Sequence, residues 1–142
     1  MEFLEKLRPF TLLVVRCAVG AIFMAHGYQK YSHGVGATNQ FMAGVGLPAY
    51  FGYIAIALEL GGGALLILGL LTRPIGLLLA IEMVIAIVKV HLGGGITDIH
   101  RYEFPLALGA ASLALGTFGA GAVSLDALLF GRSFRPKSKP KP

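Results

Sequence analysis

The sequence predicts an all-α, polytopic membrane protein built as a four-helix bundle, and two observations lead to this prediction. First, the 142 residues are 56% hydrophobic and only 13% charged, with a mean hydropathy of +0.75, whereas soluble domains carry about 25% charged residues. Second, the chain holds four apolar runs, and a helix needs about 20 apolar residues to cross the hydrocarbon core of a bilayer. The composition therefore excludes a water-soluble globule, and the high apolar content excludes a disordered chain.

The predicted spans follow one another along the chain and cover residues 9–31, 49–71, 72–91 and 103–120. Pro74 fits the first turn of the third span, where proline is tolerated. The loop 32–47 contains TNQFMAG, which predicts a short helix that lies in the membrane interface or dips back into the protein. Residues 1–131 thus form a single transmembrane domain, and the Pro- and Lys-rich segment 132–142 is expected to be a disordered basic tail.

Lysine and arginine residues predict the orientation, because they are enriched in cytoplasmic loops. With an even number of spans, both termini lie on the same side as the turn between the second and third spans. That side holds Lys6, Arg8, Arg73, Arg132, Arg135, Lys137, Lys139 and Lys141, whereas the other side holds Lys30, Lys89 and Arg101. We therefore expect both termini in the cytoplasm and a multi-pass protein of the inner (plasma) membrane. Since the net charge of +5 sits mostly at the ends of apolar runs, no nucleic-acid partner is expected.

Small and polar residues form a stripe along each predicted span. Projection at 100° per residue places Arg16, His26 and Lys30 on one face of the first span, together with Val19, Gly20, Phe23 and Gly27. The corresponding stripes are Gly52, Ala55, Glu59, Gly62, Gly63 and Gly69 on the second span, Glu82, Ala86 and Lys89 on the third, and Pro105, Gly109, Ser112, Gly116 and Gly119 on the fourth. We expect these stripes to face inward, because close helix contact in lipid requires small residues.

Charged side chains inside the spans mark the candidate site, since each costs roughly 2.5–3.5 kcal/mol on insertion. Glu59 and Glu82 lie near the middle of their spans. We expect a buried Arg16–Glu59–Glu82 cluster, in which one guanidinium cannot neutralise two carboxylates. One glutamate would then be protonated or paired with another cation, which makes both glutamates candidate catalytic, proton-transferring groups. The alternative is a purely structural ion pair that fixes the helix register.

The histidines show a second asymmetry, since all four fall on the predicted extracytoplasmic half. His26 and His91 lie at span ends, whereas His33 and His100 lie in loops. Such a ring suits a quinone head group, and a metal or haem iron is the weaker hypothesis, because no pair has a ligand spacing such as HxxxH. His26 and His91 are the only weak metal candidates, and an interfacial hydrogen-bonding role is the alternative for each. The lone Cys17 rules out a disulfide or a thiolate metal site.

Several motifs in the chain resemble those of the DoxX family. They comprise Arg16, Gly20, Phe23, His26, Gly27 and Lys30, then GLP at 46–48, Glu59, Gly62, Gly63, Leu66, Gly69, Thr72 and Arg73, then Met83, Ala86, Val90 and His91, and finally Tyr102, Glu103, Pro105 and SLD at 124–126. The resemblance covers residues 10–126. It implies a four-helix membrane protein linked to redox processes, since the family is named for small subunits of archaeal terminal quinol oxidase and thiosulfate:quinone oxidoreductase. It also implies a partner polypeptide.

Three functions remain open at this point. The first is a quinone-linked oxidoreductase subunit whose cavity is lined by Arg16, His26, Lys30, Glu59, Glu82 and His91. There, His26 or Lys30 hydrogen-bonds a quinone carbonyl and a glutamate exchanges the proton, while the electrons come from a soluble or membrane redox partner, a metal or a haem. The second is a proton-coupled small-molecule transporter, which would need a homo-oligomer. The third is a non-catalytic membrane scaffold for soluble redox enzymes.

Overall fold

The computed structural model describes residues 2–131, in which every regular element is helical. In chain order the elements are α1 (Glu2–Ser32), α2 (Val35–Gly44), α3 (Phe51–Ala57), η1 (Leu58–Gly62), α4 (Gly63–Leu68), α5 (Thr72–Ala86), η2 (Ile87–His91), η3 (Leu92–Gly94), α6 (Ile99–Phe118) and α7 (Leu125–Phe130). The segments η1 and η2 are single π-helical turns that continue the adjacent α-helices. The predicted basic tail 132–142 lies outside the described residues.

Three continuous helices are long and apolar enough to cross a membrane, namely Glu2–Ser32, Phe51–Leu68 and Thr72–His91. The all-α membrane fold is therefore confirmed. Helix α6 is a fourth long helix of 20 residues and packs against α5. The structure also places a helix, α2, in the segment 32–47 where a short one was expected.

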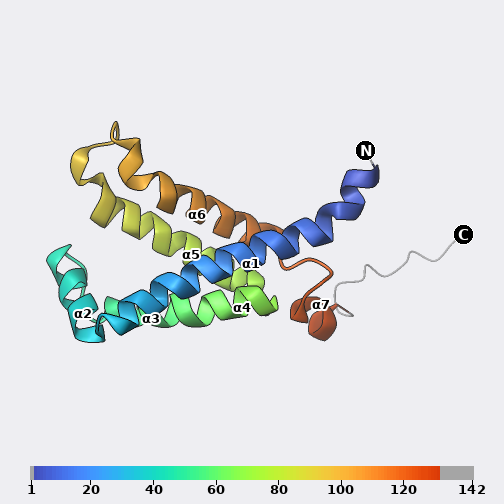
Figure 1. The fold of residues 1–142 in the computed structure, drawn as a ribbon, viewed down its shortest axis with the longest axis horizontal. Coiled ribbons are helices and arrows are strands. Elements are labelled where there is room, and N and C mark those ends of the chain that lie inside the picture. Colours follow the sequence, from blue (N-terminus) through green and yellow to red (C-terminus); the bar gives the residue numbers. More distant parts are fainter. Residues whose placement is uncertain (1, 132–142) are drawn as a thin grey trace, which may run out of the picture.

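The long helices form two packed pairs that spread apart at one end (Figure 1). In the first pair, α1 lies along the continuous helix α3–η1–α4, and in the second pair α5 lies along α6. The pairs contact each other through α5 with α4 and η1, and through α1 with α6. Their shared core is apolar and consists of Val19, Phe23, Leu66, Leu79, Met83, Leu108 and Leu115. The pairs diverge toward the end that carries α2 (Figure 1).

Burial confirms the inward stripe of the second predicted span and, apart from the half-buried Gly109, that of the fourth, whereas the stripe of the first span is confirmed only in part, because His26 is exposed and Lys30 is half-buried. On α1 the buried residues are Arg16, Val19, Gly20, Phe23 and Gly27. The stripe predicted for the third span is wrong in part, because the buried residues there are Thr72, Gly76, Leu79, Ala80 and Met83, while Lys89 is exposed. The buried face of this helix lies to one side of the predicted stripe already before η2, since Glu82 and Ala86 of α5 are only half-buried.

Glycine residues allow the helices of each pair to approach closely. A Cβ atom on Gly63 of α4 would lie 2.6 Å from the carbonyl oxygen of Gly20 on α1, and a Cβ on Gly20 would lie 2.6 Å from the Gly63 oxygen. In the other pair, a Cβ on Gly76 would lie 2.6 Å from the backbone nitrogen of Gly116. Small residues are what such close contact in lipid requires.

Arg16 does not join the two glutamates, so the expected Arg16–Glu59–Glu82 cluster is wrong. The Arg16 side chain is buried and donates hydrogen bonds to the backbone carbonyls of Ala120 at 2.7 Å, Val123 at 2.9 Å and Ile67 at 3.4 Å. Glu59 lies instead beside Gly27 of α1, on which a Cβ would come within 2.9 Å of the Glu59 Cβ. Arg16 is separated from Gly27 by about 16 Å along the helix, which is too far for its guanidinium to reach Glu59.

The segment after α6 folds back onto the turn between α4 and α5. The backbone N–H groups of Leu71 and Thr72 donate to the carboxylate of Asp126 at 2.7 and 3.0 Å, and the Asp126 N–H donates to the Gly69 carbonyl at 2.8 Å. Asp126 thus satisfies free N–H groups at the start of α5, where a negative charge is also favoured. Together with Arg16, it fixes the end of the molecule opposite α2.

Candidate ligand pocket

A pocket of about 390 Å³ opens where the two helix pairs diverge. Five of the six predicted site residues line it, namely His26, Lys30, Glu59, Glu82 and His91, whereas Arg16 does not. The rest of the lining is apolar and includes Phe23, Phe41, Met42, Phe51, Phe104 and Leu108. The volume falls within the range of small-molecule sites, which combine apolar walls with a few polar groups.

The polar side chains of the pocket come from four elements. Helix α1 contributes His26 and Lys30, which are four residues apart and share one face. Glu59 lies in the π turn η1, Glu82 lies on α5, and His91 ends the π turn η2. Both π turns therefore carry a polar residue of the pocket, and π turns within α-helices occur frequently at functional sites.

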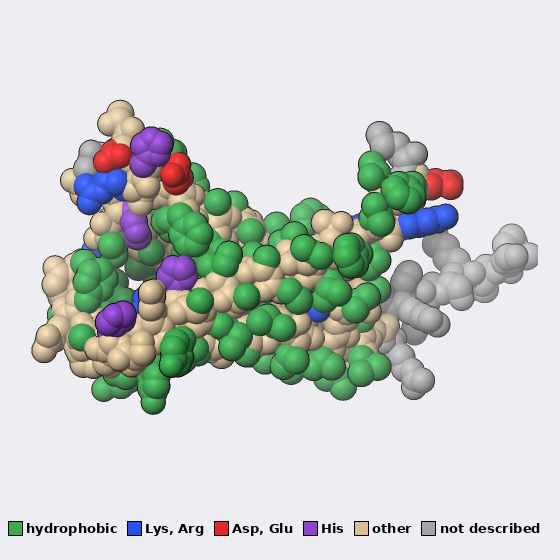
Figure 2. Space-filling model, in the orientation of Figure 1, with side chains coloured by type: hydrophobic (Ala, Val, Ile, Leu, Met, Phe, Trp, Pro, Cys, Tyr) green, Lys and Arg blue, Asp and Glu red, His purple; other side chains and the backbone are tan. Residues whose placement is uncertain are grey.

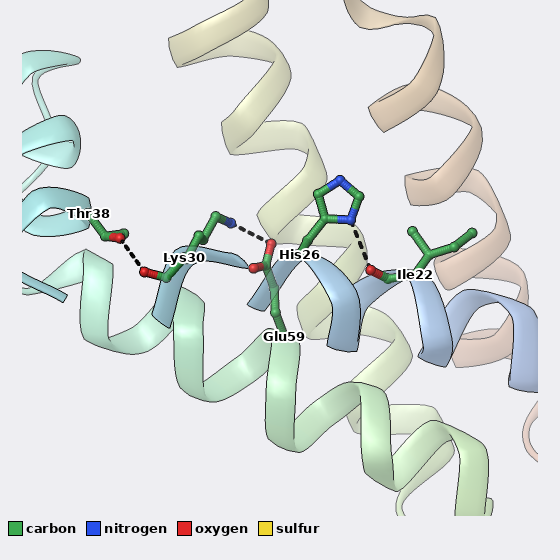
Figure 3. A network of polar contacts seen from close by, with 5 residues as sticks. All are labelled: Ile22, His26, Lys30, Thr38 and Glu59. Carbon is green, nitrogen blue, oxygen red and sulfur yellow. Dashed lines mark hydrogen bonds and ion pairs between the residues drawn. The ribbon is translucent and has the colours of Figure 1, made fainter. Parts of the chain in front are cut away.

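Lys30 and Glu59 form an ion pair inside the pocket (Figure 3). The Lys30 Nζ donates to Glu59 Oε1 at 2.5 Å, and the Glu59 side chain is only 3% exposed against 32% for Lys30. The second carboxylate oxygen of Glu59, Oε2, is buried and has no hydrogen-bond partner among residues 2–131. The hydroxyl of Thr38 on α2 donates to the Lys30 carbonyl at 3.2 Å, which holds α2 beside this pair.

Glu82 faces the same ion pair from α5. Its Oε2 is also buried and without a partner within the described part of the chain, and the charges of Glu59 and Lys30 both act on it. The site thus contains two carboxyl groups and one ammonium group. The predicted imbalance between carboxyl groups and cations is present, but Lys30 provides the cation in place of Arg16.

Two histidines of the pocket are fixed by their own helices. Nδ1 of His26 lies 2.9 Å from the Ile22 carbonyl (Figure 3), and Nδ1 of His91 lies 2.9 Å from the Ala86 carbonyl. Because a carbonyl oxygen only accepts, Nδ1 carries the proton in both rings, which leaves Nε2 as an acceptor in the neutral imidazole. The His26 ring also stacks on Phe104 of α6, with ring centroids 5.7 Å apart.

The remaining histidines lie near the pocket but do not line it. Nδ1 of His33 lies 2.7 Å from the Gln29 carbonyl, and His33 borders a smaller recess of about 260 Å³. His100 lies 3.5 Å from Glu103 at the exposed start of α6. Figure 2 shows the histidines gathered around a hollow at one end of the molecule.

Metal binding gains no support from the arrangement of these groups. Among residues 2–131, no three histidine, cysteine, aspartate or glutamate residues lie close enough together to hold an ion. His26 and His91, the two candidates from the sequence, belong to the same pocket but sit on different helix pairs.

Sequence reasoning missed three features of the pocket. The π turns have no clear signal in the residues, because helical periodicity alone predicts regular α-helices. For α2, the sequence indicated only that Phe41 and Met42 follow the polar start of TNQFMAG. It did not indicate that these two residues form part of the pocket wall. Phe104 was missed as a partner of His26, since nothing in the sequence tells which aromatic ring of α6 faces α1.

The fold and the pocket define a class of protein, namely a small all-α membrane protein with ionisable groups collected in an intramolecular pocket. The DoxX family model matches residues 11–92, and the chain belongs to this family.

Relatives with names are similar over most of the chain. "Putative oxidoreductase CatD" of Bacillus subtilis (strain 168) is 36% identical over 118 residues, which cover 83% of this chain and 86% of that protein. The inner membrane protein YphA of Escherichia coli (strain K12) is 32% identical over 84% of this chain and 90% of its own length. The inner membrane protein YqjF of the same organism is 30% identical, over 89% and 97%. No solved structure matches the chain. With its membrane-spanning helices, the chain is an inner membrane protein.

Proposed function

We propose that this chain is a membrane subunit of a redox system and that its pocket binds the head group of a quinone. One observation carries the proposal: five ionisable side chains from both helix pairs meet in a single pocket that is otherwise apolar. A quinone combines an apolar ring and tail with two polar oxygens, which matches such a lining. The printed name of one relative, "Putative oxidoreductase CatD", supports the same class of activity.

The residues of the pocket can be given roles in this proposal. Lys30 has N–H donors beyond the one used by Glu59, and these suit a quinone oxygen. Reduction of a quinone to the hydroquinone takes up two electrons and two protons. Glu59 and Glu82 would give or accept these protons as general acids or bases, and a soluble or membrane redox partner protein would give or accept the electrons.

We further propose four spans, with α6 as the fourth, and both termini in the cytoplasm. The start of α1, the α4–α5 turn and α7 lie at one end of the molecule, opposite the histidines (Figures 1 and 2), and Lys6, Arg8 and Arg73 belong to that end. In a Cys17→Ser background, Ile96→Cys should react with an impermeant maleimide on intact spheroplasts, while Glu2→Cys should react only after lysis. The reverse pattern would contradict this orientation.

Quinone content tests the proposed function directly. The protein is purified in mild detergent with native lipid, quinone is extracted from the purified sample, and its amount is measured by mass spectrometry. Wild type should retain quinone close to stoichiometrically, and Lys30→Met should lose most of it. Lys89→Met is the matched control, because Lys89 is exposed and does not line the pocket. Equal quinone content in both variants, or none in wild type, would refute the proposal and favour a scaffold or a transporter.

A further inference from the structure

The hydrogen-bonding atoms of the pocket are mostly acceptors that have no partner. Oε2 of Glu59 and Oε2 of Glu82 are buried and make no hydrogen bond within residues 2–131. Glu59 is ion-paired with Lys30, and a carboxylate has no proton to donate. A buried acceptor without a donor is unfavourable, so these two oxygens indicate that a ligand or water supplies the missing N–H or O–H groups.

The histidines add two further acceptors. Because Nδ1 of His26 donates to the Ile22 carbonyl and Nδ1 of His91 donates to the Ala86 carbonyl, Nε2 of each neutral ring carries a lone pair and no proton. Neither Nε2 has a hydrogen-bond partner in the described part of the chain. Lys30 is a strong donor among the polar lining residues, and Glu59 already uses one of its N–H groups.

We infer that this pocket selects an aromatic diol of the hydroquinone class over the corresponding quinone. The inference rests on the proposed function and specifies the ligand more closely. A hydroquinone presents two O–H donors to the acceptors of the pocket, whereas a quinone presents only carbonyl oxygens, which would face the Glu59 carboxylate without a donor between them. The aromatic lining residues Phe23, Phe41, Phe51 and Phe104 suit a ring of either form, so the preference comes from the polar atoms.

The inferred role differs from one expectation from the sequence. A neutral His26 cannot donate to a quinone carbonyl through Nε2, because its only proton is engaged at Nδ1. In this role a neutral His26 accepts from a hydroxyl group, and the remaining N–H groups of Lys30 donate to a ligand oxygen.

Binding of three matched ligands to the full-length protein in lipid nanodiscs tests this inference. The ligands are a short-tailed hydroquinone kept reduced under argon, the same compound as the quinone, and its dimethyl ether, which has the shape of the diol but no O–H donor. We expect the hydroquinone to bind roughly tenfold or more tightly than both others, because a site built to pair with hydroxyl groups rejects analogues that lack them.

Variants then assign the preference to particular atoms. Glu59→Gln replaces the acceptor-only oxygen of an ion-paired carboxylate by an amide that also donates, so it should reduce the preference for the diol. Glu103→Gln is the control, since Glu103 is exposed and does not line the pocket, and should leave the preference unchanged. If the quinone binds wild type as tightly as the diol, the inference is wrong while the proposed function stands. If none of the three ligands binds, both are wrong.

Discussion

The close contact between α1 and α4 makes a quantitative prediction about two glycines of the second span, Gly61 and Gly63. A Cβ on Gly63 would lie 2.6 Å from the Gly20 oxygen, 2.7 Å from Met24 Cγ and 3.0 Å from the Met24 nitrogen, whereas a Cβ on Gly61 would meet nothing within 4 Å. Two of the atoms near Gly63 belong to backbone, so the helices must separate to admit a methyl group. Overpacking of this kind costs about 1–3 kcal/mol.

Gly61→Ala is the matched control for Gly63→Ala. Both glycines lie in the same continuous helix, so the gain in helix propensity, about 1 kcal/mol, applies equally to both and cancels in the comparison. The difference in the free energy of unfolding is then the steric cost alone, about 1–3 kcal/mol. For a chain of 142 residues this corresponds to a Tm difference of about 4–12 °C.

The assay is thermal unfolding in detergent micelles, followed by circular dichroism, with Gly20→Ala as a second variant at the same contact. We expect Gly61→Ala to melt at or above the wild-type temperature and the other two variants to melt clearly below it. Equal Tm values for Gly61→Ala and Gly63→Ala would show that α1 and α4 do not approach as described. That result would also undermine the placement of Glu59 beside Gly27, which depends on the same pair of helices.

Two further predictions concern the end of the molecule opposite the pocket. Arg16→Met removes the hydrogen bonds to the carbonyls of Ala120 and Val123 and should cost about 2–4 kcal/mol of stability. Limited proteolysis of this variant should cleave within residues 119–131. An unchanged digestion pattern would argue against the contact. Asp126→Ala removes two hydrogen bonds at the start of α5 and should cost about 1–2 kcal/mol, measured as a lower Tm. Asp98→Ala should change the Tm little, because the Asp98 side chain caps no N–H group of α6, and equal losses in both variants would refute the capping role.

Much of the fold could be predicted because the bilayer restricts the choices. Apolar runs of sufficient length define the helices, and small or polar residues in a membrane helix face protein, as the burial of Gly20, Gly27 and Glu59 shows. The same reasoning predicted that His26, Lys30 and Glu82 belong to one site, and all three line the pocket.

The partner of each charged side chain could not be predicted. Helical projection gives the face on which a side chain lies, but it does not show which residue of the neighbouring helix lies at the same height. Arg16 and Lys30 share one face of α1, and only the packing of Gly27 against Glu59 decides that Lys30 is the cation in reach. Arg16 binds carbonyls of a segment that folds back after α6, which periodicity cannot indicate. Projection likewise missed the buried face of the third span, on which Leu79 and Met83 lie in place of Lys89.

Photoaffinity mapping tests the central claim most directly, namely that the ionisable residues share one ligand pocket between the helix pairs. A hydroquinone with a photoreactive group on the ring is activated in nanodiscs, and the labelled peptides are identified by mass spectrometry with and without excess unlabelled diol. The account predicts competed labels on α2 near Phe41 and Met42 and on α6 near Phe104, which line the pocket. Labels confined to lipid-facing residues such as Leu113 and Phe118, unaffected by the competitor, would contradict it.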